Sequence, residues 1–326
     1  MNILVTGGAG YVGSIITEGL LDKGHRVVVL DNLKQGHREA VLPEAEFHLV
    51  DICDAQAVAA VFRGAKIDAV MHLAAETAVA YSVTDPKRYF WNNVVGGLNL
   101  LEVMLRYETN KVIFSSSASV YGQPGTTRVS EHQAKAPVNS YGESKLMFER
   151  ILGWYGKAYG LKHISLRYFN AAGASERLGE DHRPETHLIP NVLKAARGKM
   201  RSVDIFGTDY PTKDGSCIRD YVHVVDIAQA HILALERVEE LSGRVYNLGS
   251  GEGHSVFEVV TTARKVTGQD IPLRICPRRS GDPAVLVASL RRAKSELGWK
   301  PSFPDLESII DSAWRWTKQH PKGYGC

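Results

Sequence analysis

A glycine-rich turn near the N-terminus constrains the fold more than any other feature of this sequence. Residues 2–6 are typical of a short buried strand with an apolar centre at 3–5. Gly7, Gly10 and Gly13 follow, and apolar residues then recur at helical spacing over 12–20. Glycines between a strand and a helix allow a tight turn and let backbone N–H groups approach a pyrophosphate, whose charge the helix N-terminus stabilises. The sequence therefore predicts a dinucleotide-binding strand–turn–helix unit rather than an ordinary glycine-rich loop.

The end of the next apolar run bears on which dinucleotide binds. Residues 26–30 are typical of a second strand, and Asp31 and Asn32 follow it. An acid about 20 residues after the glycines can accept hydrogen bonds from the adenosine ribose hydroxyls, and its charge would repel a 2′-phosphate. We therefore expect NAD rather than NADP as the cofactor. The same two residues can also form a turn, and both roles are compatible.

Strand-like and helix-like runs alternate through the first half of the chain. This alternation predicts an α/β fold with a doubly wound parallel sheet of Rossmann type. Loops become longer after residue 172, so we expect an NAD-binding domain over residues 1–172 and a smaller substrate-binding domain over 173–326, with some segments returning to the first domain. Further strands are expected at 47–50, 69–73, 112–115 and 164–168, and helices at 55–62, 94–105, 145–159, 224–235 and 256–266.

Charge and cysteine content argue against several kinds of partner. The 39 basic and 36 acidic residues leave a net charge of +3, which gives no general affinity for nucleic acid or membranes. Cys53, Cys217, Cys276 and Cys326 show no C-x-x-C spacing, so we expect reduced thiols and no metal site. Met1 leads directly into the first strand, and no apolar run approaches membrane-spanning length. We therefore expect a cytoplasmic protein without a signal peptide.

A tyrosine and a lysine four residues apart, Tyr141 and Lys145, are the first candidates for catalysis. This spacing places both side chains on one face of a helix, about 6 Å apart along its axis. A tyrosine in water has a pKa of about 10, and a nearby positive charge favours the phenolate and lowers that pKa. The pair can therefore act as a base, although the same spacing is common on solvated helices.

The order of motifs along nearly the whole chain is more specific than any one of them. Short segments follow one another at 7–13, 51–52, 92–94, 115–122, 141–145, 167–170, 207–210, 219–224 and 278–282. In this order the sequence resembles the extended short-chain dehydrogenase/reductase family, and within it the UDP-glucose 4-epimerases. The resemblance implies an isomerase that binds NAD and interconverts UDP-glucose and UDP-galactose through a bound 4-keto sugar.

The resemblance implies that Ser117, Tyr141 and Lys145 are the catalytic residues. Tyr141 would take the proton from the sugar 4-hydroxyl as hydride leaves C4 for NAD. Lys145 would hold the nicotinamide ribose and keep Tyr141 acidic, and Ser117 would hydrogen-bond the same sugar oxygen. Hydride would then return to the opposite face of the turned keto sugar, so NAD is recycled.

The resemblance also implies contacts to the cofactor and to the UDP-sugar. Arg219 and Arg279 would clamp the diphosphate, since a guanidinium matches phosphate oxygens bidentately. Cofactor contacts would come from Gly7, Gly10, Tyr11, Val12, Gly13, Asp31, Asn32, Asp51, Ile52, Leu73, Ala74, Ala75, Asn92, Ser115, Tyr141, Lys145 and Phe169. Substrate contacts would come from Ser117, Asn170, His187, Leu188, Phe206, Arg219, Arg279 and Asp282. Family members form homodimers through the helices that correspond to 94–105 and 145–159, so we expect a homodimer.

Three positions bear on which UDP-sugar is the substrate, and the sequence does not decide between the alternatives. Thr77 stands where some members place a lysine near the cofactor ribose, and His187 replaces an asparagine found in some members. Leu286 falls at a position whose size helps decide whether an N-acetyl group fits. A UDP-N-acetylhexosamine or UDP-pentose 4-epimerase is therefore an alternative.

Two other functions on the same fold are less favoured. A sugar-nucleotide 4,6-dehydratase needs an Asp–Glu pair where this chain has Ala118 and Ser119, neither of which can act as the further acid and base. A non-catalytic NAD-binding sensor is an alternative from a different class. The intact Ser117, Tyr141 and Lys145 favour an enzyme.

Overall fold

The computed structural model describes residues 1–279 and 282–325. Ser280 and Gly281, in the middle of the segment 278–282, lie outside the described residues. Cys326, one of the expected thiols, lies outside them too, and Cys53, Cys217 and Cys276 are free thiols.

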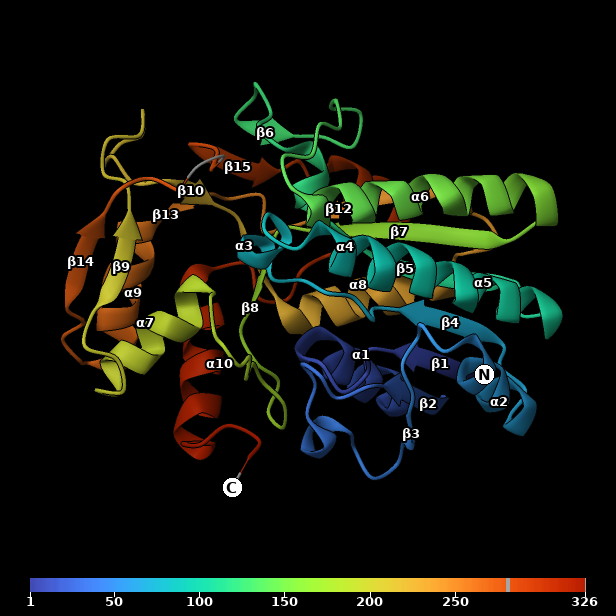
Figure 1. Ribbon diagram of the computed structural model, residues 1–326. Coiled ribbons are helices and arrows are strands. Elements are labelled where there is room, and N and C mark those ends of the chain that lie inside the picture. The colour runs from blue at the N-terminus through green and yellow to red at the C-terminus, as the bar shows by residue number, and fades with distance from the viewer. Residues whose placement is uncertain (280–281, 326) are drawn as a thin grey trace.

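The central sheet consists of parallel strands from both halves of the chain. In chain order they are β1 (Asn2–Thr6), β2 (Arg26–Asp31), β3 (Glu46–Leu49), β4 (Ala69–His72), β5 (Lys111–Ser117), β7 (Lys162–Tyr168) and β12 (Arg244–Leu248). Their order across the sheet is β12-β7-β5-β4-β1-β2-β3 (Figure 1), and every neighbouring pair is parallel. The strand order reverses between β1 and β4, where doubly wound sheets bind dinucleotides. The predicted α/β fold with a doubly wound sheet is confirmed.

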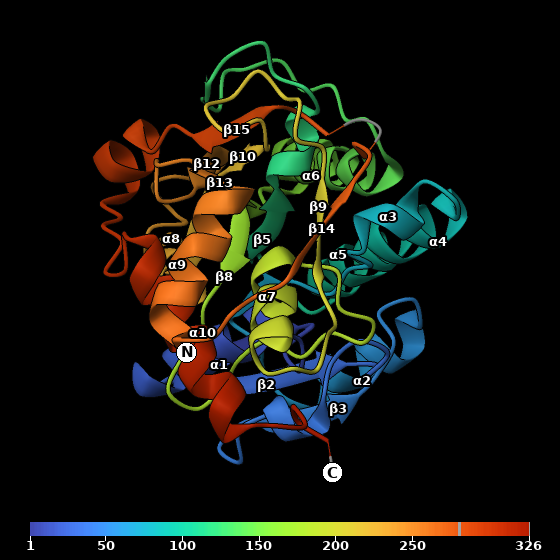
Figure 2. The same ribbon diagram turned by 90° about the vertical axis from the view of Figure 1, so that its left-hand side faces the viewer.

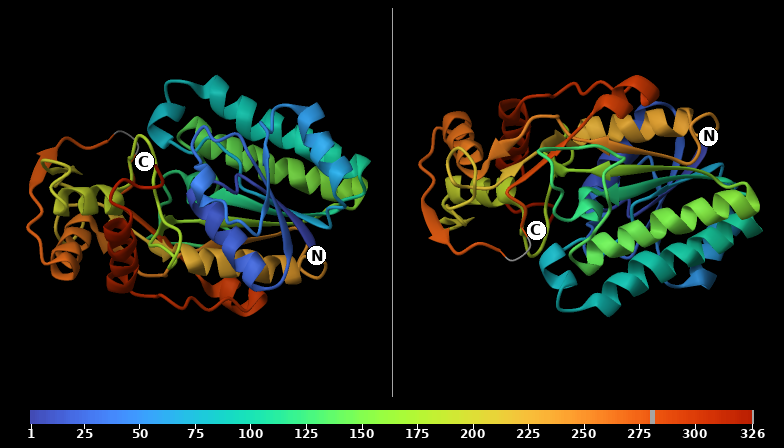
Figure 3. Two further views of the ribbon diagram at one scale, coloured as in Figure 1. Left: turned by 90° about the horizontal axis from the view of Figure 1, so that it is seen from below. Right: turned by 90° about the horizontal axis from the view of Figure 1, so that it is seen from above.

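Helices cover both faces of this sheet, as Figure 3 shows. The helices are α1 (Tyr11–Asp22) and α8 (Val224–Glu236) on one face, and α2 (Ala55–Gly64), α5 (Gly97–Arg106) and α6 (Ser140–Tyr159) on the other. Successive strand side chains point to opposite faces, so Ile3 packs in one apolar core and Leu4 in the other. Asn139 caps α6 by accepting a hydrogen bond from the Gly142 N–H at 2.8 Å, which fixes the first turn of that helix.

The second half of the chain builds a separate apolar core. Its elements lie beside the large sheet in Figure 1, and Figure 2 looks onto them. This core contains α7 (Leu188–Ala196), α9 (Val256–Thr267), α10 (Leu306–Gln319) and the parallel pair of β9 (Val203–Phe206) with β14 (Leu273–Cys276). Two small sheets lie between the halves. They are formed by β6 (Arg128–Val129), β10 (Ile218–Arg219), β13 (His254–Ser255) and β15 (Val285–Ala288), and by β8 (Asn170–Ala172) with β11 (Tyr221–His223).

Short helical turns complete the described part of the chain. They are η1 (Arg38–Ala40), α3 (Val79–Ser82), α4 (Pro86–Phe90), η2 (Trp91–Gly96), η3 (Ala118–Tyr121) and η4 (Ala293–Leu297). Two expected helices start elsewhere: the helix expected over 94–105 begins as the π-helical turn η2 and continues as α5, and the helix expected from 145 begins at Ser140. Among the described residues, no helix is long and apolar enough to cross a membrane.

Segments beyond residue 172 contribute to the large sheet and to its helical cover. β12 pairs with β7 at the edge of the sheet, and α8 packs against α1. The chain therefore passes between the two halves more than once, and residues from both halves can meet in one site.

Candidate active site

A cleft of about 1290 Å³ opens along the carboxyl ends of β1, β2, β4, β5 and β7. The glycine-rich turn lines it on the side of the large sheet, and residues of β9, β10 and the loop before α7 line it in the second half. Sites for one drug-sized ligand usually enclose about 300–1,000 Å³. This cleft has room for a dinucleotide and a second ligand.

The glycine-rich turn fits a dinucleotide pyrophosphate. Gly7 has a φ of +74°, and a Cβ added at Gly13 would lie 2.1 Å from the Gly7 carbonyl oxygen, so this turn needs glycine at both positions. Gly10 precedes α1 without any side-chain cap, and the residues from Gly10 to Gly13 border the cleft. The first N–H groups of a helix have no partner within it, so those of α1 are left for an anion.

The carboxylate expected at the cofactor ribose is fixed in the cleft wall. Asp31 accepts hydrogen bonds from the backbone N–H groups of Ala9 at 3.0 Å and Leu33 at 2.9 Å. Burial raises the pKa of Asp31, whereas these hydrogen bonds act to lower it. Each carboxylate oxygen can accept a second bond, so the ribose hydroxyls still have an acceptor.

Asp51 differs from the other expected contact residues. All of the other residues line the cleft, whereas Asp51 is not part of its lining. The Asp51 carboxylate accepts hydrogen bonds from the side chains of Asn32 at 3.0 Å and Lys34 at 2.9 Å. Burial acts to raise the pKa of Asp51, but Lys34 and the other donors hold it at about 2. Asp51 therefore orients two cleft residues.

Ser117, Tyr141 and Lys145 come together from two neighbouring elements. Ser117 ends β5, whereas Tyr141 and Lys145 lie on α6, which packs against β5. The Lys145 side chain is buried, donates a hydrogen bond to the Ser115 carbonyl oxygen at 2.8 Å, and places its Nζ 5.9 Å from the centre of the Tyr141 ring. All three side chains line the cleft. The expected pairing of phenol and ammonium on one helix is confirmed.

Burial shifts the pKa values of Lys145 and Tyr141. It lowers the pKa of Lys145 to about 7, against an opposing effect of the Glu149 charge. Burial also raises the pKa of the Tyr141 phenol above 10.0, and a hydrogen bond with Ser117 acts in the opposite direction. The lowered tyrosine pKa expected from the sequence is therefore wrong, because burial of the phenol raises the pKa by more than the Ser117 hydrogen bond lowers it.

A buried ion pair lies behind the serines of β5. Arg167 donates to Glu149 through Nε at 2.9 Å and Nη2 at 2.6 Å, and the two side chains are 3% and 7% exposed. The Ser116 hydroxyl donates to the same carboxylate at 2.5 Å, and Arg167 Nη1 donates to the Tyr121 hydroxyl at 2.7 Å. Glu149 lies one turn after Lys145 on α6. The pair therefore fixes α6 against β5 and β7.

Two arginines and an aspartate line the far part of the cleft. Arg219 forms an ion pair with Asp282 at 3.0 Å and donates to the carbonyl oxygens of Ile218 and Pro283. Arg279 stacks on Phe206, with its guanidinium carbon 3.8 Å from the ring centre. Both guanidinium groups are thus held in place, which reduces the side-chain freedom that an anion has to overcome on binding.

The other expected substrate residues border the same part of the cleft. Asn170 donates from its side-chain amide to the Asp220 carbonyl oxygen at 2.8 Å. His187 is the residue before α7, and Leu188 is the first residue of that helix. Leu286 pairs with Arg219 across β15 and β10, and both it and Thr77 line the cleft. The positions left open by the sequence therefore lie where they can affect ligand fit.

Comparison with known proteins identifies the family of the chain. The model of the NAD dependent epimerase/dehydratase family matches residues 3–249. The chain belongs to this family. A UDP-glucose 4-epimerase of Halalkalibacterium halodurans is 51% identical over 328 residues, which cover 99% of this chain and 98% of the relative.

Solved structures of epimerases superpose on nearly the whole chain. UDP-glucose 4-epimerase from Bifidobacterium longum, in complex with NAD+ and UDP, matches with a TM-score of 0.94 and 37% identity, over 99% of this chain and 100% of that one. The UDP-Glc/GlcNAc 4-epimerase from Campylobacter jejuni matches with a TM-score of 0.86 and 43% identity, over 98% and 99%. The expected family is confirmed.

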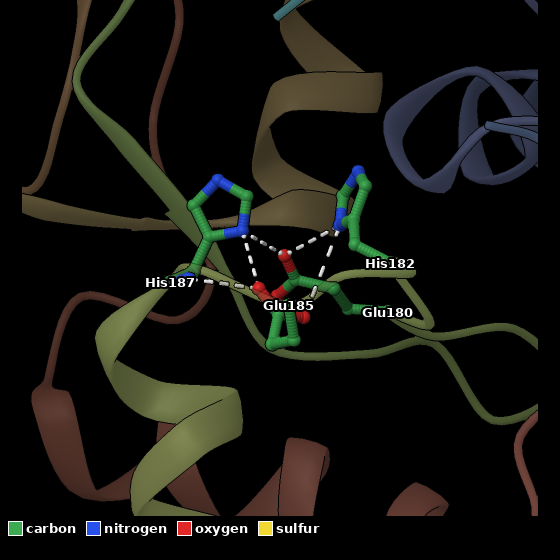
Figure 4. A group of neighbouring side chains, drawn as sticks. All are labelled: Glu180, His182, Glu185 and His187. Atoms are coloured by element: carbon green, nitrogen blue, oxygen red, sulfur yellow. Dashed lines mark hydrogen bonds and ion pairs between the residues drawn. The ribbon is translucent and has the colours of Figure 1, made fainter. Parts of the chain in front are cut away.

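One cluster in this epimerase-family chain escapes prediction from the sequence. Glu180, His182, Glu185 and His187 bring two carboxylates and two imidazoles together in the loop before α7 (Figure 4). From the sequence, His187 is expected only as a substrate contact, and the cysteine spacing predicts no metal site. The spacing E-x-H-x-x-E-x-H is the signal that could have identified this group.

Proposed function

We propose that this protein is an NAD-dependent isomerase that interconverts UDP-glucose and UDP-galactose by inverting C4 of the sugar. The observation that carries the proposal is the meeting of Ser117, Tyr141 and Lys145 in a cleft that also contains a glycine-rich dinucleotide turn. Relatives of nearly the same length, about half identical to this chain, are named UDP-glucose 4-epimerase. An acid–base group beside a cofactor cleft favours an enzyme over a sensor.

NAD fits the part of the cleft along the large sheet. The uncapped N-terminus of α1 offers N–H groups to the pyrophosphate, and Asp31 offers its carboxylate to the ribose hydroxyls. Lys34 is paired with Asp51, so it offers less positive charge to a 2′-phosphate. When bound, NAD accepts a hydride from C4 of the sugar and returns it.

The side chains of the protein handle the proton on the sugar 4-oxygen. Tyr141, as phenolate, accepts the proton of the 4-hydroxyl during oxidation and returns it when the 4-keto sugar is reduced. Ser117, hydrogen-bonded to Tyr141, also bonds to this oxygen and keeps it within reach. The protonated form of Lys145 favours the phenolate, because it places a positive charge one helical turn away.

Inversion requires that the keto sugar turns while its UDP stays bound. Arg219 and Arg279 are suited to hold the diphosphate, with Asp282 sharing Arg219 and reaching the uridine ribose. The residues proposed for the uracil are His187, Leu188 and Phe206, and Asn170 would contact the sugar. Anchoring at the diphosphate leaves the sugar ring free to present either face.

A 4-epimerase that also accepts UDP-N-acetylhexosamines is the second candidate function. The UDP-Glc/GlcNAc 4-epimerase from Campylobacter jejuni is 43% identical to this chain. Leu286 lines the cleft on β15, and its side chain is of intermediate size at a position that bears on whether an N-acetyl group fits. We expect the N-acetylated pair to react more slowly than the plain hexoses.

We also propose a cytoplasmic homodimer that does not bind nucleic acid. Trp154 and Tyr159 on α6 and Trp91 in η2 are large exposed aromatic residues, and such groups mark interaction surfaces. A two-fold dimer is the commonest assembly of soluble proteins. A monomer in light scattering at micromolar concentration would contradict the dimer.

Turnover without added cofactor tests the proposed reaction. Purified protein should convert UDP-glucose to UDP-galactose with the NAD that it carries. Tyr141→Phe keeps the ring and removes the hydroxyl, so kcat should fall by about 10²–10⁴-fold. Tyr155→Phe on the same helix, whose hydroxyl bonds to Glu102, is the control and should keep near-normal turnover. Absence of C4 inversion by NAD-loaded protein would remove the proposal.

A further inference from the structure

Four potential metal ligands meet at the wall of the cleft, and the proposed epimerase reaction needs no metal. In the described ranges 1–279 and 282–325, the ligand atoms of Glu180, His182, Glu185 and His187 all lie within 4.8 Å of one another (Figure 4). One eight-residue stretch of loop supplies all four. Such a convergence of imidazoles and carboxylates is typical of sites for divalent transition metals.

The distances between the ligand atoms suit one small cation. His187 Nδ1 lies 2.8 Å from Glu180 Oε1 and 2.8 Å from Glu185 Oε1. His182 Nδ1 lies 3.0 Å from Glu180 Oε1 and 4.0 Å from Glu185 Oε2. Around a tetrahedral zinc ion with bonds of about 2.0–2.1 Å, neighbouring ligand atoms are roughly 3.3 Å apart. The observed separations bracket this value, so small side-chain shifts would seat the ion.

The burial of the two carboxylates favours a cation between them. The side chains of Glu180 and Glu185 are 8% and 2% exposed, and both contact the same nitrogen of His187. Two ionised carboxylates out of water repel each other unless positive charge lies close to both. Here the imidazole of His187 lies between the two carboxylates, and a divalent cation held by all four side chains would supply that charge more fully.

Neighbouring groups hold the ligands in position. Glu185 Oε1 accepts hydrogen bonds from the backbone N–H groups of Thr186 at 2.7 Å and His187 at 2.8 Å, so its Oε2 is turned toward His182. The Tyr11 ring meets the His182 ring edge-on, with their centres 6.3 Å apart. Such outer contacts orient ligands and contribute to metal affinity.

We propose that Glu180, His182, Glu185 and His187 bind a structural zinc ion. Four protein ligands close the coordination shell, so the ion has no open position for a substrate. The ion would stiffen the loop that leads into α7 and carries His187 to the cleft. It would also brace this loop against Tyr11, the first residue of α1.

Metal content and thermal stability test this proposal, with a chain that carries no histidine tag. Wild-type protein dialysed against metal-free buffer should keep about one zinc per chain by mass spectrometry. His182→Gln and Glu185→Gln should lose most of it, and Zn²⁺ titration should show binding weakened by about 100-fold or more. A chelator should lower the wild-type Tm and Zn²⁺ should restore it, whereas neither should change the Tm of His182→Gln. Bound NAD and circular dichroism report whether the variants are folded.

His48→Gln is the matched control. Glu46 and His48 repeat the Glu-x-His spacing on β3, with His48 Nε2 2.9 Å from Glu46 Oε1, far from the cluster in sequence. This variant should keep the zinc content of the wild type. The zinc site is refuted if the wild type retains no stoichiometric zinc and binds Zn²⁺ no better than Glu185→Gln. Should the variants not fold, an unchanged wild-type Tm in chelator together with absence of zinc refutes it equally. These readouts do not depend on epimerase activity.

Discussion

Glu149→Gln should destabilise the protein strongly, because it leaves a buried guanidinium without its charge partner. The substitution keeps the shape of the side chain but removes the carboxylate that Arg167 contacts at 2.9 and 2.6 Å. Removing one partner of a buried ion pair typically costs about 3–5 kcal/mol. With an unfolding entropy of about 2.1 cal/mol/K per residue, a chain of 326 residues should lose roughly 4–7 °C in Tm.

Scanning calorimetry with saturating NAD measures this loss, and a second ion pair supplies the control. Arg274 also binds Asp204 through two bonds, both at 2.7 Å, but its side chain is 67% exposed. Asp204→Asn should therefore leave the Tm nearly unchanged. Replacing both buried charges, as in Glu149→Leu with Arg167→Met, should recover part of the loss. A fall of less than about 1 °C for Glu149→Gln, or an equal fall for Asp204→Asn, would show that burial does not decide the outcome.

Three further predictions concern the cleft. The folded-state pKa of Lys145, about 7, lies below its unfolded value of about 10.5, so the native state binds fewer protons between these values and its stability rises with pH. In urea unfolding of NAD-free protein, the free energy of unfolding of the wild type should therefore rise by about 3–4 kcal/mol more than that of Lys145→Met between pH 7 and pH 10. Parallel curves of unfolding free energy against pH for the two proteins would contradict this. Asp31→Ser should reduce the preference for NAD over NADP in cofactor binding, and NADP as the main nucleotide released from wild-type protein would overturn the assignment. Leu286→Ala should raise turnover of UDP-N-acetylglucosamine relative to UDP-glucose by about ten- to a hundred-fold and Leu286→Tyr should abolish it, whereas an unchanged ratio would show that Leu286 is not the gate.

The large sheet was predictable because its strands carry a local signal. Strands buried on both faces read as continuous apolar runs, as Ile3 to Val5 and Val27 to Leu30 do. The two-residue strands β10 and β13 pair with each other, and β10 also pairs with β15, so these strands depend on tertiary pairing and no local pattern marks them. The start of α6 was missed because its first turn depends on the Asn139 cap rather than on apolar periodicity.

Some features of the cleft could likewise be predicted from the sequence, whereas others depend on tertiary contacts. Gly7, Asp31 and Ser117 follow or end parallel strands, so their meeting at one edge of the sheet follows from the fold class. The pairing of Arg219 with Asp282 joins positions 63 residues apart and depends on tertiary contact. The raised pKa of Tyr141 depends on burial, which a single sequence does not give.

The return of the chain to the large sheet at β12 has a consequence for how the protein is made. Until residues 244–248 leave the ribosome, β7 is an open edge with unpaired backbone groups along one side. The cofactor-binding sheet therefore gains its last strand only after α7, β9, β10 and β11 of the second half have been synthesised. Nascent chains that stall before β12 would present the β7 edge to other chains.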